Sequence, residues 1–157
     1  MAAGTEHRFE ARVTWPKVAG TSTATTSFAR DYALSLNDKP ELLGSGPTVF
    51  QGNAAGLNPE EMFTASVTAC HMLTYLALAA YRKLTVTSYE DHGTALLQKV
   101  GPGKLKFTEV VLRPRVKIAA GGDLALAQKL HHDAHEACFV ANSVNFPIRV
   151  EASIEVG

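Results

Sequence analysis

The sequence predicts an α+β domain in which pairs of strands surround two helices. The chain has 157 residues, which lies within the range of one domain, so we expect residues 1–157 to form a single domain. Hydrophobic residues make up 46% of the chain and charged residues 19%, so the chain has enough apolar residues to form a core. Alternating patterns of strand type flank two helical patterns, and no internal repeat is present.

The first predicted element pair is a β-hairpin. Residues 9–15 alternate weakly between apolar and polar, a turn follows, and a second alternating pattern runs over residues 27–36. In that second strand Arg30 is a charged residue on an otherwise apolar face. It therefore needs an anionic partner, unless the strand is an edge strand and the side chain extends to water. Residues 37–57 show no sustained periodicity, which is typical of a lid or binding loop.

Two helices are predicted. Asn-Pro-Glu-Glu at residues 58–61 places a capping residue, a proline and two carboxylates at a helix start. This helix should run to about Arg82, and because it is apolar on nearly all sides we expect it to be central and buried. Gly-Gly-Asp at residues 121–123 precedes the second helix, which we expect to run from residue 124 to about residue 139.

Three further strand patterns complete the prediction. Residues 85–98 and 106–118 form a strand pair joined at Gly-Pro-Gly, residues 101–103. Pro114 cannot donate a backbone hydrogen bond, so its strand should be bulged there or lie at an edge. A last strand is predicted over residues 146–156.

Charge and hydropathy exclude several classes of protein. Fifteen basic and fifteen acidic residues give a formal net charge of zero, so we expect no nucleic-acid partner. The longest mostly apolar stretch, residues 72–81, is shorter than the about 20 residues that span a bilayer, so we expect no membrane segment. The first residues lack the apolar core of a signal peptide, which predicts a cytoplasmic protein.

Cys70 and Cys138 fall on the two predicted helices. A buried free cysteine is commonly a small hydrophobic residue, and that interpretation stays open for each. If the helices pack with both sulfurs on facing stripes, the two side chains can act as attacking and resolving thiols. Arg30 would then supply a cation that lowers a thiol pKa.

A zinc-stabilised domain without enzymatic activity is the alternative. His131, His135 and Cys138 share one helical face, and Cys70 would be a fourth ligand of tetrahedral zinc. The chain lacks Cys-x-x-Cys and His-Glu-x-x-His, which weakens this alternative. A cysteine hydrolase is disfavoured because His71 points about 100° away from Cys70 on the helix.

Four segments, in this order, closely resemble the OsmC/Ohr superfamily (osmotically inducible protein C and organic hydroperoxide resistance protein). They are Asn58–Phe63, Ala69–Met72, Phe107–Pro114 and Cys138–Pro147. The histidine after Cys70 is typical of the OsmC-like branch. The resemblance implies an OsmC/Ohr-like fold, with antiparallel sheets around two central helices, and an intertwined homodimer with two active sites between the subunits.

The resemblance also implies an activity and its residues. The chain would be an antioxidant enzyme of oxidative stress, a thiol-dependent peroxidase that reduces hydroperoxides, with organic hydroperoxides preferred over hydrogen peroxide. Cys70 matches the peroxidatic cysteine and Cys138 the resolving one, while Glu60 matches a glutamate that pairs with an active-site arginine. Arg30 is our candidate for that arginine, and Arg12 is the second choice. An external thiol or dithiol would be the reductant, and neither a metal nor an organic cofactor is implied.

The spacing along the first helix bears on how such a site is built. Glu60 and Cys70 are ten residues, or about 15 Å, apart on a continuous helix, beyond the reach of one side chain. A two-fold dimer would solve this by bringing the Arg30–Glu60 pair of one subunit to Cys70 of the other. A distorted first turn of the helix would be a second solution.

Overall fold

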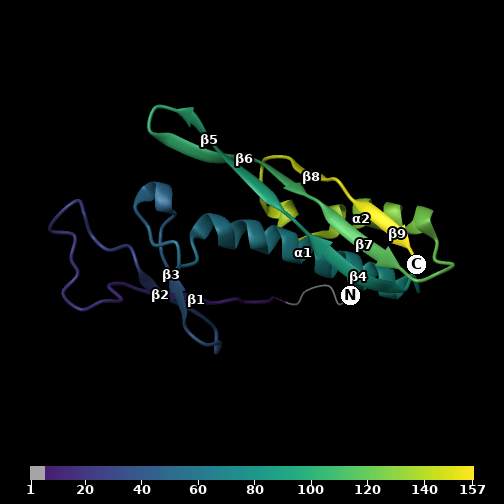
Figure 1. Ribbon diagram of the computed structural model, residues 1–157, viewed down its shortest axis with the longest axis horizontal. Coiled ribbons are helices and arrows are strands. Elements are labelled where there is room, and N and C mark those ends of the chain that lie inside the picture. The colour runs from purple at the N-terminus through teal and green to yellow at the C-terminus, as the bar shows by residue number, and fades with distance from the viewer. Residues whose placement is uncertain (1–5) are drawn as a thin grey trace. The chain divides into compact units, whose positions relative to one another are not determined.

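The computed structural model describes residues 6–157 and divides into two compact units, one ending at Met62 and the other comprising Phe63–Gly157 (Figure 1). The N-terminal unit holds strands β1 (Ala11–Thr14), β2 (Tyr32–Leu36) and β3 (Leu42–Gly44) and the short 3₁₀ helix η1 (Thr48–Phe50). Helix α1 (Pro59–Tyr81) begins in this unit and continues into the C-terminal one. The second unit contains the remaining elements.

The N-terminal unit is a three-stranded antiparallel sheet in the order β1-β2-β3, in which Val13 and Leu42 both pair with Leu34. The predicted hairpin is present, but its second strand is shorter than expected. Arg30 precedes β2, so its predicted place on an apolar strand face is wrong. The indole of Trp15 donates a hydrogen bond to the Ala29 carbonyl at 2.9 Å, so this carbonyl bonds to a side chain and not to a neighbouring strand.

The segment that the sequence predicts as an irregular loop is an ordered turn built around Ser45. This side chain is fully buried, and its hydroxyl accepts a hydrogen bond from the Asn53 backbone at 2.9 Å. The Asn53 carboxamide in turn donates to Asp31 at 3.0 Å. A Cβ on Gly52 would lie 1.6 Å from the Gly46 carbonyl oxygen, so the turn closes only with glycine there. The absence of periodicity did not mean absence of structure.

Helix α1 begins where the sequence predicts and ends one residue before the predicted position. The Asn58 carboxamide accepts from the Glu61 N–H at 2.8 Å, and the Glu61 carboxylate accepts from the Asn58 N–H at 3.4 Å, which is a capping box. Its buried residues follow one stripe: Val67, His71, Tyr75 and Ala79. The expectation of burial on all sides is wrong for the single chain, because Leu73 is 62% exposed.

By length and composition alone α1 would also be able to cross a membrane, since its mean hydropathy reaches 1.4 over an 18-residue stretch. Only 22% of that stretch is buried within the chain. The sequence prediction of no membrane segment counted only residues 72–81 as apolar, whereas the apolar helix extends over Pro59–Tyr81. Core helices of soluble proteins satisfy the same criterion, so one such helix is weak evidence for a membrane segment.

The C-terminal unit contains two three-stranded sheets, ordered β4-β7-β9 and β5-β6-β8. Their bounds are β4 (Val86–Asp91), β5 (Thr94–Gly101), β6 (Lys104–Leu112), β7 (Pro114–Ile118), β8 (Ile148–Val150) and β9 (Ser153–Val156). Each long predicted strand is therefore divided in two, and Pro114 begins a strand rather than interrupting one. Strands β8 and β9 pair in parallel with β6 and β7, so the sheets are mixed and not antiparallel throughout.

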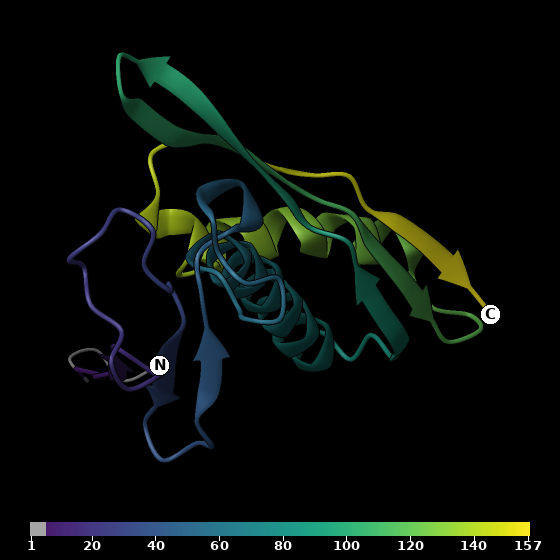
Figure 2. The same cartoon turned by 60° about the vertical axis from the view of Figure 1, so that its left-hand side comes forward.

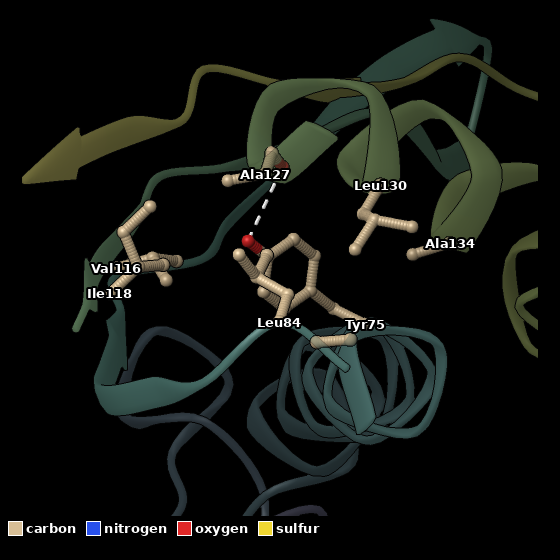
Figure 3. Packing of buried hydrophobic residues seen from close by; sticks show 8 residues of the cluster. Tyr75, Leu84, Val116, Ile118, Ala127, Leu130 and Ala134 are labelled. Atoms are coloured by element: carbon tan, nitrogen blue, oxygen red, sulfur yellow. Dashed lines mark hydrogen bonds between the residues drawn. The ribbon is translucent and has the colours of Figure 1, made fainter. Parts of the chain in front are cut away.

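Helix α2 (Leu124–Ala137) completes this unit, and both helices lie on one side of the strands (Figure 2). Asp123 caps its N-terminus by accepting from the Leu126 N–H at 2.9 Å. Side chains from α1, β7 and α2 form the main core (Figure 3). Within it the Tyr75 hydroxyl donates to the Ala127 carbonyl at 3.2 Å, which joins the two helices.

Candidate active site

The two cysteines belong to the same unit and are both free thiols. Cys70 lies in the middle of α1 and is partly exposed. Cys138 is fully buried and forms the C-cap of α2, with an extended backbone (φ −72°, ψ 114°). The helix thus ends two residues earlier than predicted, and Cys138 is outside it.

The Cys138 thiol is held as a protonated group beside Cys70. Burial and a hydrogen bond with Cys70 raise the pKa of Cys138 to about 11. The sulfurs are not at a disulfide-like distance. Cys138 is therefore a thiol at neutral pH, and only Cys70 of the two is accessible to solvent.

The predicted charged residues of the site lie in the N-terminal unit. The guanidinium carbon of Arg30 is 4.5 Å from the centre of the Phe28 ring, and its Nη1 donates to the Phe28 carbonyl at 3.1 Å. Glu60 is in the first turn of α1, and its charge, after burial, helps to raise the pKa of Tyr32. Arg12 is on the exposed strand β1. The catalytic roles of these three residues remain predictions.

His71 and His131 form a buried pair that the sequence did not predict. His71 Nε2 and His131 Nδ1 lie 3.2 Å apart, and the Tyr75 ring stacks on His131 at 4.1 Å between centroids. His71 is 1% exposed and His131 5% exposed. The four-residue spacing of His71 and Tyr75 indicates that both lie on the buried stripe of α1. The sequence does not indicate that His131 is the partner of His71, because the two are 60 residues apart.

This pair makes stability depend on pH. Burial, with repulsion from a neighbouring histidine, lowers the pKa of His71 and of His131 to about 4. In the unfolded chain both rings bind protons near pH 6.5, so the unfolded state gains protons first as the pH falls. We expect the free energy of unfolding to decrease from about pH 6.5 to pH 4, by on the order of 3 kcal/mol for one ring.

Urea unfolding at pH 7.0 and at pH 4.5 tests this expectation. His71→Phe should lose part of the pH dependence, whereas His92→Gln, at an exposed position, should retain it. If the free energy of unfolding changes equally with pH in wild type, His71→Phe and His92→Gln, then groups other than His71 cause the pH dependence.

The predicted zinc ligands are not brought together. Within residues 6–157 no group of three or more His, Cys, Asp or Glu side chains is arranged to hold a metal ion. His131 instead directs Nδ1 to His71, and Cys138 lies near Cys70 beyond the end of the helix. The geometry therefore does not support the alternative of a zinc-stabilised domain, because the described side chains proposed as ligands do not converge on one point.

Elemental analysis should accordingly find no stoichiometric zinc in the purified protein, since a tight site needs a complete ligand set. Zinc at one ion per chain that is lost in His135→Ala would contradict this.

Comparison with known proteins gives one consistent result. The family model described as OsmC-like protein matches residues 51–153. An OsmC-like protein of unknown function from Vibrio cholerae has a similar structure, with 32% identity, a TM-score of 0.86, and coverage of 94% of this chain and 100% of that one. No curated protein matches the sequence.

Two more distant structures share the fold. An organic hydroperoxide resistance protein from Elizabethkingia anophelis is 19% identical, with a TM-score of 0.71 and coverage of 98% of this chain and 99% of that one. A protein named organic hydroperoxide resistance protein OsmC from Legionella pneumophila is 21% identical, with a TM-score of 0.67 and coverage of 98% and 100%.

Proposed function

Because this chain belongs to the OsmC-like protein family, we propose that it is a thiol peroxidase that reduces organic hydroperoxides. The observation that carries the proposal is the thiol pair: Cys70 is partly exposed, and the neighbouring Cys138 is buried and protonated. A nucleophile needs access to substrate, and a resolving thiol needs protection from it. The names of the two distant relatives are consistent with this substrate class.

The first step oxidises Cys70. Its thiolate attacks one oxygen of the hydroperoxide, the O–O bond breaks, and the alkoxide leaves and takes up a proton to become an alcohol. Cys70 becomes a sulfenic acid. The sulfur itself changes oxidation state, so no metal or organic cofactor is needed.

In the second step Cys138 attacks the sulfur of this sulfenic acid, forming a disulfide and releasing water, and the Cys138 proton leaves with the departing hydroxide. The sulfurs must approach one another for this step. Cys138 is at the C-cap and is not an interior residue of α2. An external thiol or dithiol then reduces the disulfide.

The remaining parts of the site form, in our proposal, in a cytoplasmic homodimer. The exposed apolar side of α1, which includes Leu73 (62% exposed) and Tyr81 (84% exposed), would be covered by a second copy. Arg30 would stabilise the Cys70 thiolate, and Glu60 would orient the guanidinium. Since α1 is continuous from Pro59 to Tyr81, Glu60 and Cys70 of one chain are about 15 Å apart along its axis, which favours the arrangement across two subunits.

Consumption of cumene hydroperoxide by the purified protein, with dithiothreitol as reductant, tests the proposal. One equivalent of the peroxide without reductant should give an intramolecular disulfide, seen by intact mass as the loss of two hydrogens. Two unreacted thiols after this treatment would overturn the proposed function.

A further inference from the structure

Phe28 and Trp15 contact the segment that carries Arg30 in the N-terminal unit. The Arg30 guanidinium lies over the Phe28 ring and donates to the Phe28 carbonyl. Trp15 packs edge-on against the same ring, with 5.9 Å between centroids, and its indole donates to the Ala29 carbonyl. All of these contacts come from residues that precede Arg30 in the chain.

The ordered turn around Ser45 contacts Arg30 and Asp31 as well. A Cβ on Gly46 would lie 3.4 Å from Arg30 Cδ, so the turn backbone packs against the arginine side chain. The Asp31 carboxylate accepts hydrogen bonds from the Asn53 carboxamide, at 3.0 Å, and from the Ser45 hydroxyl. These two hydrogen bonds lower the pKa of Asp31, so Asp31 is ionised at neutral pH.

Asn53 is the residue that joins the far end of this turn to Asp31. Its backbone N–H donates to Ser45, and its backbone carbonyl accepts from the Gly56 N–H at 3.0 Å. Its carboxamide oxygen accepts from the Ala55 N–H at 2.9 Å, and its amino group donates to Asp31. A carboxamide is therefore required at this position, because its oxygen stabilises the turn and its amino group holds Asp31.

Glu60 acts on the same short segment. Burial, and then the charge of Glu60, raise the pKa of Tyr32, which is two residues from Arg30. The Tyr32 ring occupies the space that a Cβ on Gly44 would fill, so it is packed directly on the backbone of β3. The segment that carries Arg30 therefore also lies near Glu60, and Asp31 is the central residue of this segment.

We propose that Asn53 is a positioning residue for Arg30: by holding Asp31, it fixes the backbone from which the guanidinium acts on Cys70 of the second copy. This inference rests on the proposed function, in which Arg30 stabilises the Cys70 thiolate. A guanidinium on a long side chain stabilises a thiolate only while it stays close to the sulfur. A displacement of about 1 Å at a supporting residue is enough to lower the rate of a reaction strongly.

Asn53→Asp tests this role because it removes the amino group and keeps the oxygen that accepts from Ala55. The contact with Asp31 is lost, and two carboxylates replace it. The kcat/KM for cumene hydroperoxide should fall by about tenfold. The midpoint pH for alkylation of Cys70 by iodoacetamide, followed by intact mass, should rise by up to about one unit. Unchanged values of both quantities would overturn the proposal.

A donor–acceptor exchange and a matched control complete this test. Asp31→Asn/Asn53→Asp reverses the direction of the hydrogen bond and keeps the net charge, so it should recover most of both quantities. Asn37→Asp makes the same chemical change in the same unit, but its side-chain oxygen still accepts from the Glu10 N–H, so neither quantity should change. An exchange variant as impaired as Asn53→Asp, or an equal loss in Asn37→Asp, would overturn the specific role of Asn53.

The Arg30→Ala background separates positioning from a direct effect of the added charge. In that background Asn53→Asp should not shift the alkylation midpoint any further, because the residue it positions is absent. An equal shift with and without Arg30 would show that Asn53 does not act through Arg30, and would overturn the inference. Disulfide formation by wild type with one equivalent of peroxide tests the proposed function separately. A wild type that forms the disulfide, together with an unimpaired Asn53→Asp, would overturn this inference alone.

Discussion

Replacing Cys70 by serine should lower peroxide turnover by roughly a thousandfold or more, to the background rate, because the attacking thiolate is lost. Replacing Cys138 by serine should have a different outcome. That variant should complete one attack, since Cys70 is intact, and should then stop, because no resolving thiol remains. Both variants should fold, as the Cys to Ser change is close to isosteric, although the Cys138→Ser variant places a more polar hydroxyl where the buried thiol was.

Intact mass after graded cumene hydroperoxide separates these outcomes. Wild-type protein should lose two hydrogens, Cys70→Ser should not change, and Cys138→Ser should gain one oxygen and, at higher peroxide, further oxygens as Cys70 reaches sulfinic and sulfonic acid. Peroxide turnover by Cys70→Ser at the wild-type rate would remove Cys70 from the mechanism. A disulfide-free, fully active Cys138→Ser protein would remove Cys138 as the resolving thiol.

Mixing two inactive variants should restore activity if the site is built from two subunits. Neither the Cys70→Ser homodimer nor the Arg30→Ala homodimer should turn over peroxide. In a mixed dimer one interface would combine intact Arg30 and Glu60 from the first chain with intact Cys70 from the second, while the other interface would lack both Arg30 and Cys70. Each mixed dimer should therefore carry about half of the wild-type activity.

The chains must be unfolded and refolded together, because an intertwined dimer exchanges subunits slowly. Native mass spectrometry would confirm the mixed dimers, and co-refolded wild type would control for losses on refolding. Mixtures of Cys70→Ser with Cys70→Ala provide the matched control, since no combination of these chains holds a thiol at position 70. If confirmed mixed dimers are as inactive as their parents, the placement of Arg30 and Glu60 across the interface is wrong.

Local features of the sequence determined much of the fold. The start of α1 was predictable because Asn58 and Glu61 satisfy one another's backbone N–H groups within a single turn. The hairpin between β5 and β6 was predictable because its turn needs glycine, as at Gly103 with a φ of 65°. The family resemblance rests on similarly short segments, and the OsmC-like family match confirms it.

Long-range contacts decided what local patterns could not. Arg30 lies outside its predicted strand, next to the Ala29 carbonyl that accepts a hydrogen bond from Trp15. The predicted zinc ligand His131 instead meets His71 from another helix. Periodicity reports which face of an element is apolar but not which distant group will contact it. The amino-acid order was therefore enough to indicate both helices, the hairpins, the two thiols and the family, but not how the long predicted strands are divided. The folded chain was needed to establish that Cys138 is a buried, protonated partner of Cys70, because burial and that contact together set its pKa.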